Sequence, residues 1–413
     1  MLASGLVMGC PAASDPDPAI EDDGTTTSGR TSTDGIGTTA GSVDSSDSEG
    51  TGDSTGAPPG TTACVSGCES TDDGESTEDI PDAELDCHDG IDEDDDDRLD
   101  CVDSDCWDDR ECAARFLRVA TWNVRDIGEE GEQQHDQLVA VIQRIDADVL
   151  CLQEVGDAEQ GALEAVATAS GYEHVVLAPA EGTPTGFIRN ACLSRIEPAG
   201  ADVLYADDLS SDASANDLTR PFVRLRLLVE SADRYVTILA AHLKSGEDDV
   251  DRFRRMVEAI RLGQAVEAER DIFPDNAIVA LGDFNETPLA GEQTFTELPD
   301  GLPLSYELGN DIAFPLSYEP FAPLDDAALE RVHARVEDTP WTDTYLPGLV
   351  RLDYIYEDAG DVAVAEVYEA CEDDGVDDFP YGDVLPKVGE PLACGVSADA
   401  SDHRPVVAVF YLP

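Results

Sequence analysis

Basic side chains are scarce in this 413-residue sequence: 24 Lys and Arg residues stand against 91 Asp and Glu residues, which gives a formal net charge of -67. Residues 1–113 contain 32 acidic and only 3 basic side chains, with few large apolar residues. Such a segment cannot bury enough apolar surface to offset the conformational entropy lost on folding. We therefore expect it to be largely disordered, and we expect residues 114–413, which have regular apolar runs, to form one globular domain.

Long apolar runs are also absent, and no stretch reaches the roughly 20 residues that a transmembrane helix needs. Residues 1–10 are apolar and end at Cys10, which resembles the end of a bacterial lipoprotein signal whose cysteine is lipidated. No Lys or Arg precedes Arg30, so the positively charged start of such a signal is missing. We expect a lipid anchor at Cys10, through which the membrane is a partner. The expected location is the cell envelope if the protein is anchored, or outside the cell if it is secreted. The alternative is an apolar terminus with an incidental cysteine.

Residues 11–80 are rich in Ser, Thr, Gly, Asp and Pro, a composition typical of a flexible, disordered linker. The sequence has 11 cysteines, so ten remain if Cys10 is lipidated, and an even number is compatible with disulfides in an oxidising compartment. Cys371 and Cys394 bracket an acidic loop, and we expect them to pair. The other pairings stay open.

Residues 81–113 form an acidic, cysteine-rich segment with carboxylates at alternate positions. A hard cation such as Ca²⁺ needs about six or more converging oxygen ligands, and the spacing here follows that of a calcium-binding loop. Asp97 stands where such loops have Gly, so the segment is more similar to disulfide-framed, Asp-rich calcium repeats of extracellular proteins than to an EF-hand. A solvated acidic run is the alternative. The expected Ca²⁺ ligands are Asp92, Asp94, Asp96, Asp100 and Asp103.

The globular region alternates patterns that are typical of strands and helices. Strand patterns occur at 116–124, 148–154, 172–178, 188–195, 221–229, 234–243, 277–284, 351–357, 361–368 and 404–411. Helical patterns occur at about 138–145, 159–169 and 250–270. Many strands with a few interspersed helices favour a layered α/β or α+β sandwich.

Several of these strands end in polar side chains. Asn123 and Glu154 end the first two, and similar residues follow at 242–244, 283–285, 353 and 402–403. A single polar strand end is usually a turn former or a cap. Several such ends from different strands favour an active site, because a rigid sheet can hold them together.

Six motifs in order resemble those of the endonuclease/exonuclease/phosphatase superfamily, which has the deoxyribonuclease I-like fold. They are Thr121-Trp122-Asn123, Leu152-Gln153-Glu154, Ala241-His242-Leu243-Lys244-Ser245, Leu281-Gly282-Asp283-Phe284-Asn285, Arg351-Leu352-Asp353-Tyr354-Ile355 and Ser401-Asp402-His403-Arg404-Pro405. The resemblance covers essentially all of residues 116–413. It implies a four-layered sandwich of two packed mixed β-sheets flanked by helices, and hydrolysis of phosphate esters with Mg²⁺ or Mn²⁺.

Phosphodiester chemistry gives these residue types their expected roles. The substrate is anionic, so a hard cation must neutralise its oxygens while water attacks. Glu154 and Asp402 suit that cation as carboxylate ligands, and Asn123 suits it as a neutral ligand. His403 can accept the proton of the attacking water if Asp353 orients its ring.

The resemblance implies further roles. Asp283 and Asn285 are expected to position the water and the phosphoryl oxygens, and His242 to bind the phosphate or assist the leaving oxygen. Family members that use this histidine as an acid often pair it with a Glu on the strand at 188–195, which here reads Ile188-Arg189-Asn190-Ala191-Cys192, so its role as proton donor stays open. We expect Lys244 and Arg220 to bind phosphate.

The substrate is a separate question, because one fold serves many phosphoesters. A nuclease usually has a basic footprint, whereas residues 114–413 are acidic overall. Residues 189–261 nevertheless contain 11 basic and 13 acidic side chains. Their arginines either form a basic patch near the site or pair with acidic neighbours. We expect an exported, monomeric nuclease acting on DNA or RNA.

Two alternatives remain. The first is a secreted lipid phosphodiesterase similar to sphingomyelinases, or an inositol-phosphate phosphatase; the lipid enzyme needs an exposed apolar loop, for which residues 314–316 and 320–321 are the candidates. The second is an inactive, calcium-binding surface protein. The intact set of Asp283, Asn285 and His403 argues against lost activity.

Overall fold

The computed structural model describes residues 83–413, except for 85, 93, 95–97, 108, 157–158, 180–187, 206–214, 289–292, 338, 374 and 376–384. These described residues belong to one compact unit, Glu75–Pro413. The expectations for residues 1–10, for the linker at 11–80 and for lipidation of Cys10 fall outside the described residues, and so does that for Asp96.

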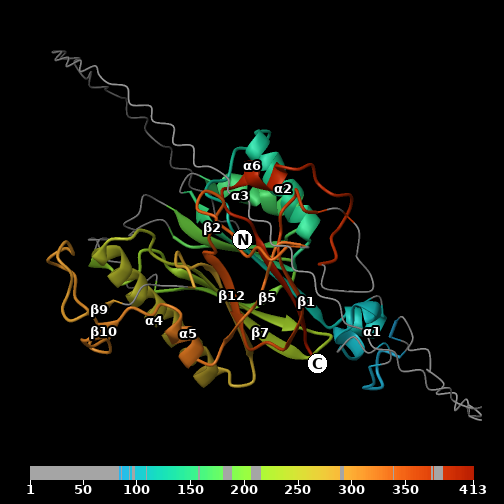
Figure 1. The fold of residues 1–413 in the computed structure, drawn as a ribbon, viewed down its shortest axis with the longest axis horizontal. Coiled ribbons are helices and arrows are strands. Elements are labelled where there is room, and N and C mark those ends of the chain that lie inside the picture. Colours follow the sequence, from blue (N-terminus) through green and yellow to red (C-terminus); the bar gives the residue numbers. More distant parts are fainter. Residues whose placement is uncertain are drawn as a thin grey trace, which may run out of the picture. The chain divides into compact units, whose positions relative to one another are not determined.

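Two mixed six-stranded sheets form the centre of this unit (Figure 1). The first has the order β13-β14-β1-β2-β4-β3 and the second β11-β12-β8-β7-β6-β5. The first sheet consists of β13 (Asp361–Val367), β14 (Val406–Tyr411), β1 (Phe116–Asn123), β2 (Val149–Val155), β4 (Arg189–Ser194) and β3 (His174–Leu177). The second consists of β11 (Glu330–Arg331), β12 (Asp353–Glu357), β8 (Ala277–Asp283), β7 (Arg234–His242), β6 (Phe222–Val229) and β5 (Pro198–Leu204). A small hairpin pairs β9 (Thr294–Phe295) with β10 (Leu316–Ser317).

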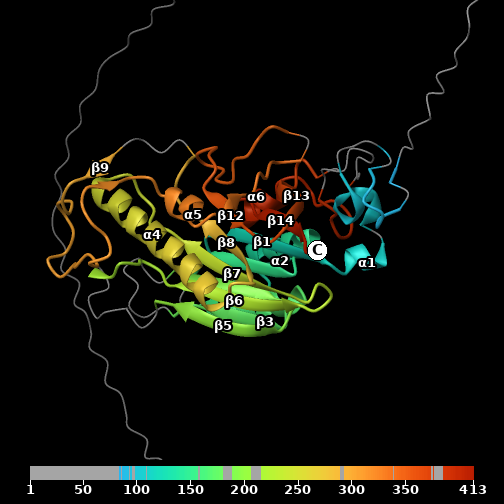
Figure 2. The same cartoon turned by 90° about the horizontal axis from the view of Figure 1, so that it is seen from below.

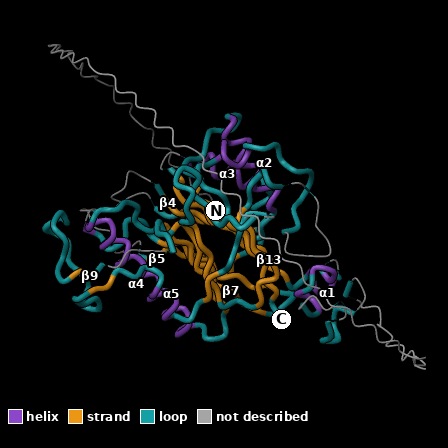
Figure 3. Tube along the Cα trace, viewed as in Figure 1, coloured by secondary structure: helices purple, strands orange, loops and turns teal. Residues whose placement is uncertain are grey.

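Helices lie on both sides of the strands, as Figure 3 shows. The first sheet is covered by α2 (Gln133–Ile145), α3 (Gln160–Ala169) and α6 (Val396–Ala400), and the second by α4 (Asp249–Ile272) and α5 (Ala322–Asp326). The acidic segment carries η1 (Asp100–Val102), η2 (Ser104–Cys106) and α1 (Arg110–Ala113). The prediction of two packed mixed sheets flanked by helices is confirmed.

Alternation along the strands explains the layers. In β8, Val279 and Leu281 are buried between the two sheets, whereas Ile278 and Ala280 belong to the cluster under α4 and α5. A strand whose side chains are apolar on both faces must be covered on both faces, because successive side chains point to opposite sides. Figure 2 shows α4 lying along the second sheet, where it provides that cover.

The strand β5 was not predicted from the sequence. It contains Pro198, Gly200 and Asp202, residue types that are depleted in strands. It forms as an edge strand because β6 pairs with it from Leu204↔Phe222 to Pro198↔Leu227, and an edge position tolerates a proline. Tertiary pairing therefore outweighs local propensity here.

Four disulfides join the cysteines of the described region. The expected pair Cys371–Cys394 is present. The other three bonds are Cys87–Cys106, Cys101–Cys112 and Cys151–Cys192. The last one joins register partners on β2 and β4 inside the core, three residues before Glu154.

Candidate active site

The polar residues at the ends of β7, β8 and β12 form one row across the second sheet. His242 is the register partner of Asp283, and Asp283 is the register partner of Asp353. All three are buried, with at most 1% of each residue exposed. His242 and Asp353, which lie more than 100 positions apart in the sequence, therefore come together at the same end of neighbouring strands.

The first sheet contributes to the same place through the end of β1. Asn123 Nδ2 donates to Asp283 Oδ2 at 2.8 Å, which joins the two sheets. The Asp283 Oδ1 atom accepts from the backbone N–H of Asn285 at 2.8 Å. Ser401 Oγ donates to the carbonyl oxygen of Asn123 at 2.6 Å. These contacts fix the orientation of the Asp283 carboxylate from both sheets.

His403 lies just before β14 and pairs with Asp353. The distance between His403 Nδ1 and Asp353 Oδ2 is 2.7 Å, and the Nε2 atom lies 4.0 Å from Asp283 Oδ2. Thr344 Oγ1 accepts from the backbone N–H of Asp353 at 3.0 Å and so holds the start of β12. The ring of Tyr345 lies beside the His403 ring, with 4.9 Å between centroids. The Nε2 atom therefore faces the centre of the site.

Two of these groups titrate far from their ordinary ranges. Burial and the charge of Asp353 together raise the pKa of Asp283 to about 7, against the charge of His403 and the hydrogen bonds from Asn123 and Asn285. Burial lowers the pKa of His403, but the charge and hydrogen bond of Asp353 outweigh burial and raise it to about 10. At neutral pH, His403 is a cation and Asp283 is near its titration midpoint.

His242 has the opposite character. Burial, followed by the charge of Arg220, holds the pKa of His242 well below its ordinary value, so the ring is neutral. Its Nε2 atom lies 3.8 Å from Glu154 Oε1 and 3.6 Å from Asp283 Oδ2. Neither ring nitrogen has a hydrogen-bond partner among the described residues. Glu154 reaches this point because β2 has an irregular register with β4 there and Glu154 itself has a positive φ of 63°.

The donor set around His242 fits a divalent cation. Ligand atoms of Glu154, His242 and Asp283 all lie within 4.8 Å of one another, and those of Asp283, Asp353 and His403 form a second such group. Two carboxylates that converge on a neutral imidazole with unbonded nitrogens leave an excess of negative charge and of acceptor atoms. A hard cation compensates both.

Asp402, a predicted cation ligand, pairs with an arginine. Its Oδ2 atom forms an ion pair with Arg125 Nη1 at 3.2 Å, and it belongs to neither group of candidate ligands in the described region. The backbone N–H of Arg125 donates to Asn123 Oδ1 at 2.9 Å. Of the three predicted cation ligands, the structure thus brings Glu154 near the His242–Asp283 pair, links Asn123 to Asp283 and leaves Asp402 with Arg125.

The predicted phosphate ligands are engaged within the protein. Lys244 Nζ lies 2.7 Å from Asp251 Oδ1 and donates to the carbonyl of Ser245. Arg220 is 2% exposed, and its Nη1 atom is 3.4 Å from the carbonyl oxygens of His242 and Leu243. Arg220 therefore lies beneath the backbone of the site, where its charge acts on His242.

The other arginines between 189 and 261 follow the pairing alternative. Arg224 pairs with Asp202 and Glu269, and Arg252 pairs with Glu247. Arg261 pairs with Asp217 and Asp311. Arg226, Arg254 and Arg255 stack on aromatic rings or donate to backbone carbonyls. Ion pairs, ring contacts and backbone carbonyls therefore engage these side chains in the described part of the region.

The acidic segment gathers part of the predicted calcium set. Carboxylate oxygens of Glu84, Asp94 and Asp103 lie within 4.8 Å of one another. Asp100 instead accepts from the backbone N–H of Gly90 at 3.0 Å, and Asp92 is not a member of the group. Glu84 was not predicted, because it precedes the spaced carboxylates by eight residues or more.

Several residues of the site were not predicted. Arg125, Thr344 and Ser401 hold Asn123, Asp353 or Asp402 through the contacts given above. Arg255, fully buried on α4, donates to the carbonyl oxygen of Asn285. Ser401 stands next to a motif, which is a signal, but nothing in the sequence distinguishes Arg255 from its arginine neighbours.

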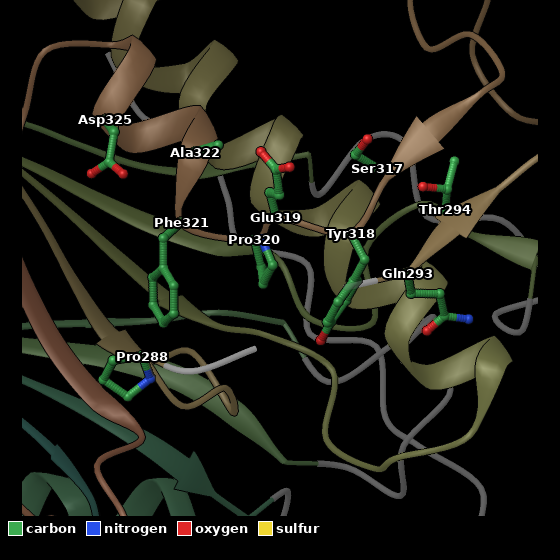
Figure 4. Close-up of a pocket in the computed structure, with 10 residues that line it drawn as sticks. All are labelled: Pro288, Gln293, Thr294, Ser317, Tyr318, Glu319, Pro320, Phe321, Ala322 and Asp325. Atoms are coloured by element: carbon green, nitrogen blue, oxygen red, sulfur yellow. The ribbon is translucent and has the colours of Figure 1, made fainter. Parts of the chain in front are cut away.

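A pocket of about 620 Å³ opens beside the loop that follows Asn285 (Figure 4). Pro288 and Phe321 line one side, and Gln293, Thr294 and Ser317 the other. Glu319 and Asp325 also line it, and no Lys or Arg is among the described lining residues. Because three peptide units separate Pro288 from Asn285, their Cα atoms are at most about 11 Å apart.

The fold and this site define a class: a two-sheet sandwich with carboxylates, imidazoles and an amide gathered at the strand ends. A model of the Endonuclease/Exonuclease/phosphatase family matches residues 120–403, which is more than half of the chain. The protein belongs to this family, whose members are hydrolases of phosphoester bonds and generally depend on divalent metals.

Solved structures with a similar fold come from several organisms. An endonuclease/exonuclease/phosphatase from Beutenbergia cavernae DSM 12333 is 18% identical, with 71% of each chain covered and a TM-score of 0.46. Truncated TDP2 from Caenorhabditis elegans is 16% identical, with 72% of this chain and 97% of that chain covered and a TM-score of 0.41. Beta toxin from Staphylococcus aureus is 16% identical, with 71% and 99% covered and a TM-score of 0.42. No curated protein matches the sequence significantly.

Proposed function

We propose that this protein is a divalent-metal-dependent phosphodiesterase. The observation that carries the proposal is the convergence of His403, Asp353 and Asp283 with Glu154 and His242 at one end of the sandwich. Phosphodiester hydrolysis needs charge neutralisation, a positioned water and proton transfer, and this set has groups for all three.

Glu154, Asp283 and His242 are the residues that would hold the cation. When bound, the cation neutralises phosphate oxygens and stabilises the charge that develops during attack. Asn123 donates to Asp283 Oδ2 and so fixes the carboxylate that would hold the cation. Neutral His242 suits this arrangement, because an imidazolium would repel the cation.

The proton transfers follow from the placement of Asp283 and His403. Asp283, whose carboxylate is oriented by Asn123 and the backbone N–H of Asn285, is placed to orient the attacking water and accept its proton. His403, whose pKa is about 10, starts as an imidazolium that Asp353 stabilises, and its Nε2–H can stabilise the phosphate and protonate the leaving oxygen. This differs from the expectation from the sequence, which gave the role of base to His403.

The first substrate class to test is nucleic acid, because the motif order, with His242-Leu243-Lys244-Ser245, is similar to that of exported bacterial nucleases. The test is an assay of the full-length protein with Mg²⁺, Mn²⁺ or Ca²⁺ against duplex DNA, RNA, sphingomyelin and inositol phosphates. Metal-dependent cleavage of DNA or RNA supports the nuclease. Hydrolysis of none of the four by folded protein contradicts the phosphodiesterase proposal.

A second candidate is a phosphodiesterase of small or lipid-borne substrates. The pocket beside Pro288 favours it, because a cavity lined by Glu319 and Asp325 without described basic residues repels the next phosphate of a polynucleotide. The pairing of the arginines at 189–261 favours it too. Selective turnover of sphingomyelin over DNA in the same assay would decide for this candidate.

Export and attachment are part of the proposal. The four disulfides support an oxidising compartment. Among the described residues, no helix has the length and apolar character of a membrane crossing. We propose lipidation of Cys10 as the attachment, with the protein acting as a monomer. Incorporation of labelled fatty acid that is lost in Cys10→Ser tests the anchor.

A further inference from the structure

Arg255 of α4 reaches into the space beneath the two loops that follow β7 and β8. It is fully buried. Its Nη1 atom donates to the carbonyl oxygen of Asn285 at 2.6 Å, and its Nη2 atom donates to that of Gly246 at 2.6 Å. One guanidinium group thus joins a backbone position next to the candidate catalytic carboxylate to the loop that carries Lys244.

The loop held by Arg255 depends on such a tether. Asn285 has a positive φ of 52°, a backbone conformation that costs free energy for a residue other than glycine. Its backbone N–H donates to Asp283 Oδ1, and its Nδ2 atom donates to the carbonyl oxygen of Leu243 at 3.0 Å. A shift of Asn285 would therefore move the Asp283 carboxylate as well.

Glu258, one helical turn beyond Arg255, holds the other side of the same region. Its carboxylate accepts from the backbone N–H and the hydroxyl of Thr219 at 2.7 and 2.6 Å, and from the backbone N–H of Lys244. Residues three positions apart lie on one face of a helix. A single face of α4 therefore presents a cation and an anion to the loops around the site.

The energetics separate this arrangement from ordinary packing. The buried guanidinium of Arg255 loses its hydration, which costs free energy. The Glu286 carboxylate offsets part of this cost, because its Oε2 atom lies 3.7 Å from Arg255 Nε. The planar guanidinium presents several donors in a fixed fork, whereas the ammonium of Lys is a single point that cannot span the same two carbonyl groups. Charge alone would therefore not replace Arg255.

We propose that Arg255 is a positioning residue of the active site, which acts through Asn285 on Asp283, with Glu258 holding the Lys244 side. This inference rests on the proposed phosphodiesterase function. Reaction rates are sensitive to such placement, since an error of about 1 Å can lower turnover about 100-fold. The chemistry stays with Asp283 and His403, which Arg255 does not touch in the described contacts.

The test is a double-mutant cycle in the full-length protein, with bis(p-nitrophenyl) phosphate and Mn²⁺ as the probe. Arg255→Lys should lower kcat by about 10- to 100-fold with a smaller change in KM. In the Asp283→Asn background the same substitution should lower the residual kcat by less than about 3-fold, because the carboxylate that Arg255 positions through the backbone of Asn285 is already lost. Arg252→Lys, three positions earlier and paired with Glu247, is the matched control and should change kcat little.

Equal fold-changes in both backgrounds would overturn the proposal, since a general loss of stability does not depend on the Asp283 carboxylate. Wild-type protein that is inactive on this probe and on the substrate panel would instead reject the proposed function. Hydrogen exchange then tests the clamp without activity: Arg255→Lys should speed exchange about tenfold in peptides covering 243–247 and 284–287 and leave the centres of β7 and β8 unchanged. Unchanged exchange in both loops would reject the clamp.

Discussion

His403 and Asp353 form a buried ion pair, with 2.7 Å between Nδ1 and Oδ2, and one is 50 positions from the other in the sequence. The pairing keeps the imidazole charged although burial opposes its charge. A charged, oriented imidazole with its Nε2–H directed toward the site is the group that a leaving oxyanion needs.

Replacing His403 by Ala should lower the turnover number by at least about 100-fold, because positioned proton transfer typically contributes 10²- to 10⁴-fold. Asp353→Asn should also slow turnover, since the neutral amide no longer stabilises the imidazolium. The double variant should be little worse than His403→Ala, because partners that act as one unit give non-additive effects. Steady-state kinetics of the four proteins measure this, and fully multiplicative effects would show that the two residues act independently.

The cation site is tested at Glu154. Chelation of divalent ions should abolish hydrolysis, and Glu154→Gln should raise the Mn²⁺ concentration needed for half-maximal activity by about tenfold or more, because one charged ligand is lost. Asp402→Asn is the informative comparison. If Asp402 stays with Arg125 during catalysis, its replacement should change the metal requirement much less than Glu154→Gln does. Activity that persists in excess chelator would contradict the metal-dependent mechanism.

The strand ends of the site could be predicted because they are local signals. Asn123, Glu154, Asp283 and His403 each stand at the border of a run of strand-forming residues, and their motif order matches a family. Sheet pairing then brings these borders together, since register partners such as His242 and Asp283 are set by the alternation of buried positions.

The supporting contacts could not be predicted in the same way. The partner of Asp402 is Arg125, and the partner of Asn285 is Arg255, and both pairings depend on how loops cross in space. The sequence of an arginine-rich segment does not show which of its arginines are exposed and which are buried. Arg252 and Arg255, three positions apart, share a face of α4. Their burial differs because the carbonyl groups of Asn285 and Gly246 lie at Arg255, whereas Arg252 lies nearer the start of the helix and pairs with Glu247.

The acidic segment offers two rival calcium sites that a titration can separate. The sequence spacing requires Asp92 and Asp94, whereas the structure gathers Asp94 with Glu84 and Asp103. We expect calorimetric titration of the full-length Glu154→Gln protein, in which the catalytic cation site is weakened, to give binding that Asp94→Asn removes and Asp92→Asn leaves in place. Equal loss in both variants would favour the spacing. No heat at about 1 mM Ca²⁺ would remove the calcium site altogether.

Stability should depend on pH through a buried cluster outside the proposed catalytic set, in which Lys387 Nζ lies 2.7 Å from Glu337 and 3.1 Å from Glu366. Burial raises the pKa of Glu366 to about 7, against the attraction of Lys387. A carboxyl whose pKa is higher in the folded state than its ordinary 4.5 binds a proton more tightly when folded. The contribution of Glu366 protonation to the free energy of unfolding is therefore complete below about pH 4.5. It is lost as the pH rises through about 7.

Glu366→Gln keeps the shape of the protonated acid and cannot ionise, so it removes this contribution to the pH dependence. Between pH 4.5 and 7.5, the free energy of unfolding of the wild-type protein should fall by about 3 kcal/mol relative to that of the variant, at about 1.36 kcal/mol per unit of pKa shift. Urea unfolding at four or five pH values measures the difference, with Glu267→Gln on the exposed side of α4 as the control. Parallel pH profiles for wild type and Glu366→Gln would mean that Glu366 is already ionised in the folded protein, and that Lys387 compensates fully for its burial.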